Sequence, residues 1–259
     1  MASKNNNLKA FIRLDGNYQI VPSSLILQKN KPAVGKWEEI NINQCCNYVP
    51  TTTTTSTSTT TTTTLLPYFC SLGDITIGTQ IWTGCNLNVD TYRNGDPIPQ
   101  VTDQIEWANL TTGAWCYYNN DSSNGSVYGK LYNWHAVNDP RGLAPVGYHI
   151  PSNTEWGTLI TFLGGGGTAG GALKESGLDH WQSPNTGATN SAGFTALPGG
   201  FRYAGGMFIN KNSQSNWWTS VERALTTARL VQISYLFETI SNDSWDNKNY
   251  GLSVRLIKD

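Results

Sequence analysis

The sequence predicts an α+β fold in which a C-terminal domain follows a small β module and a Thr-rich linker. The first observation is a run from Thr51 to Thr64 that is Thr throughout except for Ser56 and Ser58. The second is that helical patterns precede strand patterns in the part of the chain after this run. The third is the composition: 26 Gly, 10 Trp and 12 Tyr, with only 14% charged residues, are typical of a loop-rich fold with aromatic anchors.

The Thr-rich run separates two stretches that have the composition of folded protein. It contains no large apolar residue and no charge, so it cannot build a core. We interpret it as a solvated spacer, with an O-glycosylated stalk or a segment ordered by association of several chains as alternatives. The expected organisation is an anchor module at residues 1–47, a linker at 48–71 and a C-terminal domain at 72–259.

The overall charge and hydropathy exclude several classes of partner. A formal net charge of −1 gives no reason to expect nucleic acid or an anionic membrane surface. The sequence lacks the apolar run of about 18 residues that membrane insertion requires. Its first residues, MASKNNN, lack the apolar core of a signal peptide, so we expect synthesis in a cytoplasm and, if the protein acts outside a cell, another route of export.

The five cysteines follow no recognisable framework. No Cys-x-x-Cys pair or Cys/His zinc spacing is present. We therefore expect reduced, mostly buried thiols. Cross-links between chains stay open as an alternative at the cysteines that flank the Thr-rich run, Cys45, Cys46 and Cys70.

The N-terminal module is predicted to be a small β unit. Strand patterns cover residues 8–14, 18–21, 24–27 and 36–40, and Asp15-Gly16-Asn17 is typical of a tight turn. About 40 residues form too small a core for a stable independent domain. We therefore expect this module to form a homotrimer or to dock on a partner, and so to act as an anchor.

The first half of the C-terminal domain is predicted to contain a hairpin and several helices. The hairpin covers residues 75–82, a single helical turn covers 103–107 and a longer helix covers 128–137. Ser152 and Glu155 form a capping box that begins a helix over 152–163. A short helix is expected at 169–175.

The second half is predicted to consist of strands and loops. Strand patterns cover residues 194–202, 217–220, 228–236 and 251–257. In the last of these, Leu252, Val254 and Leu256 alternate with Ser253 and Arg255, which is the pattern of a strand with one buried face. Helices followed by strands make the domain α+β.

Specific motifs extend over nearly the whole C-terminal domain. They include Pro151-Ser-x-x-Glu-Trp156, Leu197-Pro-Gly-Gly200, Trp217-Trp218-x-Ser220 and Gly251-x-Ser-Val-Arg255, with further stretches at 91–99, 112–121, 128–134 and 138–145. By these motifs residues 73–259 resemble the Fibrobacter succinogenes major paralogous domain. That resemblance implies a C-type-lectin-like fold of the formylglycine-generating-enzyme branch, with Leu252 in place of the aromatic residue usual in the closing motif.

The N-terminal module resembles a different group of proteins. Residues 10–17, 24–27 and 31–37, together with the Cys-Cys junction to the Thr-rich run, are similar to structural proteins of tailed phages of Bacteroidetes, including crAss-like phages. The resemblance implies a virion fibre or decoration protein that attaches through its N terminus. Other virion proteins would then be its partners.

The motifs of known catalytic and metal sites are missing from the sequence. The formylglycine branch uses a late cysteine pair for its chemistry, whereas no cysteine follows Cys116 here. The Glu-Pro-Asn, Gln-Pro-Asp and Trp-Asn-Asp motifs of calcium-dependent lectins are absent. The pattern Gly165-x-Gly167-x-x-Gly170 follows a predicted helix rather than a strand and is interpreted as a helix stop. We therefore expect no catalytic residues, no metal and no cofactor, and we interpret the histidines as core or loop residues: His135, His149 and His180.

A binding face is expected between the Trp217-Trp218 pair and the last strand. In the wider fold this region carries the ligand face, and here residues 221–249 mix aromatic and adaptable polar side chains as binding surfaces do. The alternative is that half of them fill the core, and Trp217 and Trp218 are themselves expected to be structural. We interpret this region as loops that carry seven ligand-binding candidates: Arg229, Gln232, Tyr235, Phe237, Asn242, Trp245 and Asn247.

The sequence therefore favours a non-enzymatic phage virion fibre or decoration protein. Its lectin-like domain would bind a glycan or protein on the host cell surface, and the protein would lie on the virion surface. One alternative is an adhesin on a bacterial cell surface that carries the same domain. A less favoured alternative is an enzyme on the formylglycine-generating scaffold.

Overall fold

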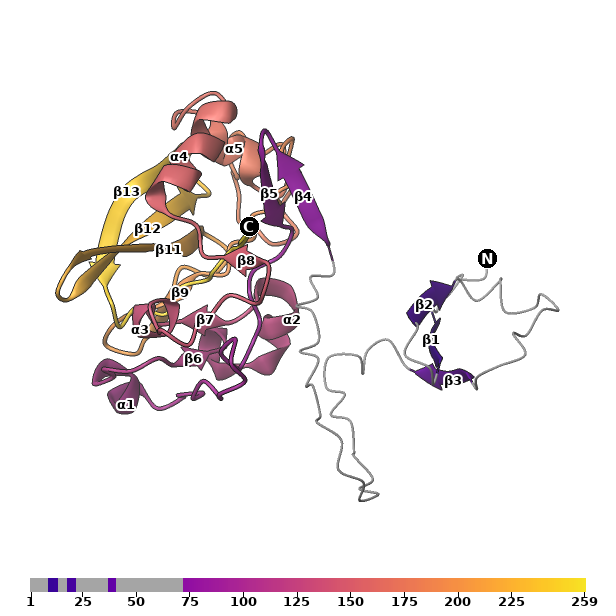
Figure 1. The fold of residues 1–259 in the computed structure, drawn as a ribbon. Coiled ribbons are helices and arrows are strands. Elements are labelled where there is room, and N and C mark those ends of the chain that lie inside the picture. The colour runs from indigo at the N-terminus through magenta and orange to yellow at the C-terminus, as the bar shows by residue number, and fades with distance from the viewer. Residues whose placement is uncertain (1–8, 14–17, 22–36, 41–71) are drawn as a thin grey trace, which may run out of the picture. The chain divides into compact units, whose positions relative to one another are not determined.

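The chain divides into two compact units, Met1–Thr63 and Thr64–Asp259, in a computed structural model that describes residues 9–13, 18–21, 37–40 and 72–259 (Figure 1). The first unit contains an antiparallel sheet in the order β2-β1-β3. Its strands are β1 (Lys9–Arg13), β2 (Tyr18–Val21) and β3 (Trp37–Ile40). Three of the four predicted strands are confirmed, and the fourth, at 24–27, lies outside the described residues.

The described part of the second unit begins and ends in the same four-stranded sheet. The predicted hairpin at 75–82 is confirmed, and its second strand pairs with the last strand of the chain, so that the sheet order is β4-β5-β14-β8. The strands are β4 (Asp74–Ile77), β5 (Gln80–Thr83), β8 (Tyr148–His149) and β14 (Ile257–Lys258). This pairing fixes the C terminus beside the start of the domain.

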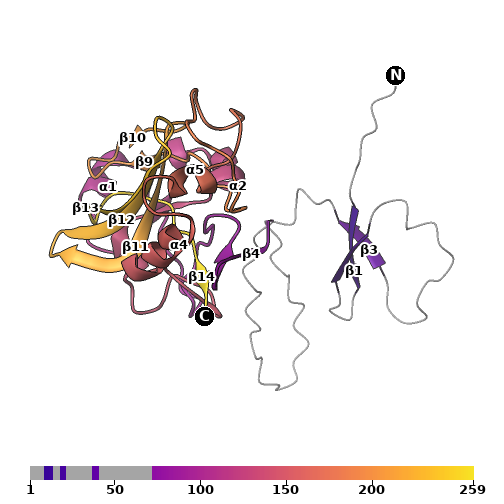
Figure 2. The ribbon, with the colours of Figure 1, turned by 90° about the horizontal axis from the view of Figure 1, so that it is seen from above.

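A second, longer sheet lies along one side of the unit (Figures 1 and 2). It is antiparallel in the order β11-β12-β13, formed by β11 (Gln214–Ala224), β12 (Thr227–Ser234) and β13 (Ile240–Asn247). Two short antiparallel pairs complete the strands of the unit: β6 (Trp115–Cys116) with β7 (Leu131–Tyr132), and β9 (Phe201–Arg202) with β10 (Phe208–Ile209).

The helices are short and begin at identifiable caps. Asp103 accepts hydrogen bonds from the backbone N–H groups of Ile105 and Glu106 and so begins α1 (Gln104–Ala108). The predicted capping box of Ser152 and Glu155 is confirmed at the start of α4 (Asn153–Phe162), which packs against β11 and β13. The other helices are α2 (Gly125–Tyr128), α3 (Trp134–Val137), α5 (Ala169–Leu173) and two 3₁₀ turns, η3 (Tyr118–Asn120) and η4 (Ser122–Asn124). Helices and antiparallel strands together make the unit α+β, as predicted.

The continuous helix predicted over 128–137 is wrong. Gly129 ends α2 with φ +76°, and a Cβ there would lie 2.8 Å from the carbonyl oxygen of Leu87, so only glycine fits. Asn133 then begins α3 by accepting a hydrogen bond from the backbone N–H of Ala136. The apolar residues across 128–137 therefore belong to two short helices and to the strand β7 between them.

The single strand predicted over 251–257 is also largely wrong. Only Ile257 joins a named strand, while Gly251, Leu252 and Ser253 form isolated bridges with three different partners. Both alternating sets are buried, because this segment passes through the core instead of along its surface. Arg255, expected on a solvated face, is buried and donates hydrogen bonds to the carbonyl oxygens of Thr83 and Phe194. The strand predicted over 194–202 is likewise reduced to Phe201–Arg202.

The core is rich in aromatic side chains on both sides of the long sheet. On the α4 side, the rings of Trp156 and Trp217 lie 5.6 Å apart, and Phe194 meets Trp217 edge-on at 5.8 Å. Trp218 points to the opposite side, into a second buried cluster. Both adjacent tryptophans are fully buried, which confirms their structural interpretation.

The two described cysteines of the second unit differ from each other. Cys116 is free and buried, as expected, and burial raises its pKa to about 12. Cys85 is disulfide-bonded, which corrects the expectation of a reduced thiol there. Cys85 is only half-buried, unlike Cys116. Among the helices that the structure describes, none has the length and apolarity needed to cross a membrane.

Candidate binding face

The outer part of the long sheet extends beyond the core. In β11 the side chains from Ser215 to Thr219 are buried, whereas those from Ser220 to Ala224 are exposed or half-buried. Leu225, in the turn between β11 and β12, is 88% exposed. Figure 1 shows this hairpin projecting away from the helices. These strands are therefore held by the core at one end and are open to solvent at the other.

Trp245 lies on this projecting part and is 47% exposed. It stands opposite Arg229 in the β12–β13 register, and the guanidinium carbon of Arg223 lies 3.5 Å from the centre of its ring. Arg229 forms an ion pair with Asp243. We call these four residues, Arg223, Arg229, Asp243 and Trp245, the Trp245 cluster.

The contacts of the Trp245 cluster contribute little to folding. A cation–π contact at an exposed site is worth about 0.5–1 kcal/mol, and an exposed ion pair about 0–1 kcal/mol. Asp243 and Trp245 are both well exposed. A large aromatic side chain on a projecting strand, with weak local contacts, is therefore available for contact with a ligand.

The structure brings only some of the predicted binding residues together. Arg229 and Trp245 are cross-strand neighbours, and Asn247 stands opposite Thr227 at the same end of the sheet. Gln232 pairs with Asn216 and Ser241 further along, nearer the core.

Asn242 is directed to the helix side of the sheet. Its backbone oxygen accepts a hydrogen bond from the Asn153 side chain at the start of α4, and its own amide nitrogen lies near Gly157. This places Asn242 beside the helix that supports the sheet, away from the exposed ring of Trp245.

Tyr235 and Phe237 lie at the other end of the sheet, between β12 and β13. Tyr235 is half-buried against the α4-side core, and its backbone oxygen accepts a hydrogen bond from the N–H of Thr186. Phe237 is 58% exposed, and its backbone oxygen accepts a hydrogen bond from Lys174. The seven predicted residues therefore fall into separate places, and only Arg229, Trp245 and Asn247 share the projecting end.

The strand predicted over 228–236 is confirmed as β12, but the loops predicted for the rest of 221–249 are wrong. The end of β11 and all of β13 lie in that region, and β13 occupies most of its second half. Its sequence, ISNDSWDN, has no apolar alternation after Ile240, because beyond that residue one face of the strand is exposed and the other is only half-buried. Without the strand pairing, nothing in the sequence places Arg223 next to Trp245, from which 21 residues separate it.

Comparison of the chain with known protein families gives a match. The model described as the Fibrobacter succinogenes major domain matches residues 75–258. The chain belongs to this family. No curated protein and no solved structure matches the sequence. The matched region runs from β4 to β14, so the Trp245 cluster lies within the Fibrobacter succinogenes major domain itself.

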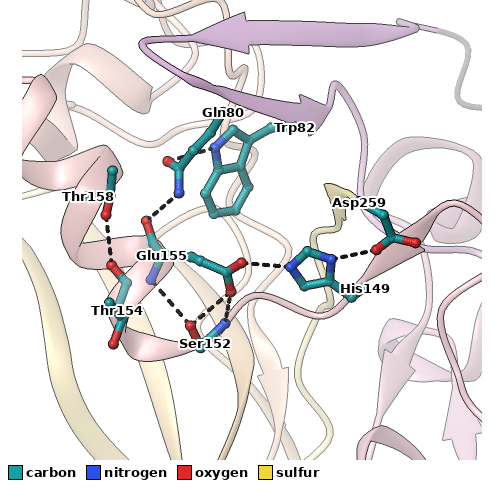
Figure 3. A network of polar contacts seen from close by, with 8 residues as sticks. All are labelled: Gln80, Trp82, His149, Ser152, Thr154, Glu155, Thr158 and Asp259. Atoms are coloured by element: carbon teal, nitrogen blue, oxygen red, sulfur yellow. Dashed lines mark hydrogen bonds and ion pairs between the residues drawn. The ribbon is translucent and has the colours of Figure 1, made fainter.

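A second polar network in this Fibrobacter succinogenes major domain surrounds His149 (Figure 3). Its Nδ1 lies 2.7 Å from Asp259 and its Nε2 lies 2.7 Å from Glu155. Glu155 also accepts hydrogen bonds from the backbone N–H and the hydroxyl of Ser152. Because carboxylates occupy both ring nitrogens, His149 has no free nitrogen with which to exchange a proton with a substrate. The network joins β8, α4 and the C terminus, which is a structural role.

The protonation states in this network support each other. Burial lowers the pKa of His149, but its hydrogen bonds with Glu155 and Asp259 outweigh burial and leave the pKa raised. Burial raises the pKa of Glu155, but hydrogen bonds from Ser152 and His149 outweigh it and leave the pKa lowered. Each partner therefore favours the charged form of the other.

The other two histidines of the domain also have neighbours that fix their rings. His135 lies 3.0 Å from the amide oxygen of Asn249, and burial lowers its pKa. Nδ1 of His180 is 2.9 Å from both carboxylate oxygens of Glu175. Within the described part of the chain, no group of three or more His, Cys, Asp or Glu residues is placed to hold a metal ion.

Lys174 secures the end of the sheet opposite the Trp245 cluster. Its side chain is fully buried, and Nζ donates hydrogen bonds to the carbonyl oxygens of Thr186, Ser234 and Phe237 at 2.7–3.2 Å. Burial lowers the pKa of Lys174 to about 8, against a smaller opposing effect of Glu238. The turn between β12 and β13 is thus held to α5, whereas the turn between β11 and β12 is exposed.

Proposed function

We propose that the chain is a non-enzymatic recognition protein whose C-terminal domain binds a glycan or protein on a host cell surface through the Trp245 cluster. The observation that carries the proposal is the exposure of Trp245, at 47%, on a strand that projects from a core holding most of the other tryptophans. Exposed aromatic residues framed by Arg and Asn are typical anchors of binding faces.

We further propose that this domain has a C-type-lectin-like fold. Two elements support it. The helix begun by Pro151-Ser-x-x-Glu-Trp156 places Trp156 against Trp217 of the Trp-Trp motif in one core, as those scaffold motifs imply. The segment between Trp218 and Gly251, which carries the ligand face in the wider fold, contains the projecting strands and the Trp245 cluster.

For the whole protein, we propose a virion fibre or decoration protein on the virion surface. The support is the resemblance of the N-terminal module and the Thr-rich run to phage structural proteins. The module would attach to other virion proteins, and the linker would hold the binding domain away from the particle. An adhesin on a bacterial cell surface is the second candidate, because the Fibrobacter succinogenes major domain alone does not distinguish the two.

The proposed assembly is a homotrimer formed through the N-terminal module. Strands β2 and β3 are the outer strands of its sheet as far as the described residues extend, and such strands can pair with another chain. Light scattering on the full chain and on a variant lacking residues 1–47 is expected to give a trimer and a monomer, respectively. A trimer in both samples would show that the chains associate through the C-terminal domain instead.

The binding proposal is tested with Trp245→Ala in the full chain. A buried aromatic anchor in an interface contributes about 2 kcal/mol or more, so attachment to host cells is expected to weaken about tenfold or more. The matched control is Phe162→Ala, which removes another exposed aromatic ring, on α4. Both variants should unfold cooperatively. Equal attachment by Trp245→Ala and the unsubstituted protein would contradict the proposal.

The same attachment assay separates this proposal from calcium-dependent recognition. The sequence lacks the calcium-lectin motifs, and the described residues form no cluster of three metal-ligating side chains. Treatment with a calcium chelator is therefore expected to leave attachment unchanged. A loss that added calcium restores would instead assign the binding to a metal site.

A further inference from the structure

Arg223 is a surface cation that has no acidic partner among the residues that the structure describes. Its guanidinium lies over the ring of Trp245 at 3.5 Å, and in the described part of the chain its side chain forms no hydrogen bond or ion pair. Arginine presents N–H donors in a planar fork that matches a carboxylate or sulfate group. Stacking on an aromatic ring restrains this fork while its donor edge stays available to a ligand.

Two of the three neighbouring acidic residues are paired with other cations. Glu222 contacts Lys248, and Asp243 contacts Arg229. The third, Asp246, interacts with Tyr250 and, because it is next to Trp245 in β13, lies on the opposite face of that strand. On the face that carries Trp245, the positive charge of Arg223 is therefore left without a matching negative charge, and this favours an anionic ligand.

The surface around Trp245 suits a sugar better than a protein partner. Apart from Leu225 in the turn between β11 and β12, Trp245 is the exposed large apolar side chain at the projecting end of the sheet. Protein interfaces usually contain a wider apolar core within a contact of about 800 Å² per partner. A single exposed ring edged by polar side chains, such as those of Asp243 and Asn247, instead matches the apolar face and hydroxyl groups of one or two sugar residues.

We infer that the Trp245 cluster binds an acidic glycan. Its carboxylate or sulfate group accepts hydrogen bonds from Arg223, and its sugar ring packs against the exposed part of Trp245. This inference rests on the proposed function and narrows it to one class of ligand.

The first test is an array of sialylated, uronic-acid-containing, sulfated and neutral glycans probed with the full chain. Binding to carboxylated or sulfated glycans above their neutral counterparts is expected, and the two acidic groups on the array distinguish carboxylate from sulfate recognition. Preference for neutral glycans, or no binding to any glycan, would overturn the inference.

The second test measures affinity for the best-bound acidic glycan and its neutralised form, the methyl ester or the desulfated sugar. Arg223→Gln is expected to weaken binding of the acidic form about tenfold and to leave the neutral form unchanged. Arg223→Lys keeps the charge but not the fork, so part of the preference should return. Lys258→Gln, which removes one positive charge from the four-stranded sheet, is the control and should have no effect.

The outcomes separate this inference from the proposed function. If Trp245→Ala weakens attachment to host cells but Arg223→Gln leaves the acidic preference intact, the recognition role holds and the assignment of the acidic group to Arg223 is wrong. If Trp245→Ala leaves attachment intact, the proposed function itself fails. Attachment that survives removal of surface glycans but is lost after protease treatment of the cells would show that the Trp245 cluster binds a protein instead of a glycan.

Discussion

Trp217 and Trp245 lie in the same three-stranded sheet but have opposite environments. Trp217, on β11, is fully buried, donates a hydrogen bond to Asn86 at 2.9 Å and packs against Trp156. Trp245, on β13, is 47% exposed, and its ring contacts Arg223. The strands that complete the core therefore continue outward and present an aromatic ring to solvent.

Under the proposed function, this difference separates two roles of the sheet. Packing on both sides holds the inner residues of β11 and β12 in place. The outer residues continue the same strands, so their positions are fixed although they contribute little to stability. A rigid strand presents a side chain with a smaller loss of conformational entropy on binding than a flexible loop would. Substitutions in the inner part should affect folding, and those in the outer part should affect binding.

Trp217→Ala gives the largest expected effect on stability. It removes a fully buried indole and leaves the Asn86 amide oxygen with one donor fewer, so the free energy of unfolding should fall by about 3–5 kcal/mol. Denaturant unfolding followed by circular dichroism measures this change. Trp245→Ala is the matched comparison and should cost less than about 1 kcal/mol. Similar losses for the two variants would show that the projecting part also supports the fold.

Lys174→Met is expected to have an intermediate effect, at the end of the sheet opposite Trp245. It leaves three carbonyl oxygens without their buried donor, which should lower the free energy of unfolding by about 2 kcal/mol. Glycan or cell binding through Trp245 should be unchanged, since Lys174 holds the other turn. A loss of binding equal to that of Trp245→Ala would show that the two ends of the sheet act as one site.

The titration of Lys174 gives this prediction a pH dependence. Its pKa is lowered to about 8 in the folded protein from an ordinary value of 10.5, so the unfolded chain binds more protons between these values. Stability due to this group therefore rises as the pH increases from about 8 to about 10.5. The variant lacks the titrating amine, so its difference in stability from the unsubstituted protein should grow over this range.

The sequence predicted the parts of the fold whose signals are local. The capping box of Ser152 and Glu155 and the turn between β4 and β5 are set by neighbouring residues, and both were located correctly. The β13 strand and the burial of Arg255 depend on partners far along the chain, so local patterns could not reveal them. The same applies to the binding face: Trp245 was recognisable as a candidate by residue type, but its contact with Arg223 arises from strand pairing.

The smallest expected effect concerns His149, which joins the C terminus to α4 far from the Trp245 cluster. Because its pKa is raised in the folded protein, its contribution to stability is complete below the ordinary value near 6.5 and is lost as the pH rises through the folded value. His149 and Asp259 are both substantially exposed, so solvent screening limits the contribution to about 0.5–1 kcal/mol. His149→Gln should therefore be destabilised relative to the unsubstituted protein at about pH 6 and less so at about pH 8, as measured by denaturant unfolding.

Below this range the lowered pKa of Glu155 acts in the opposite direction, since its contribution to stability is lost as the carboxylate takes up a proton. A difference between the two proteins that stays constant with pH would mean that His149 acts through packing alone, and binding through Trp245 should be unaffected in either case.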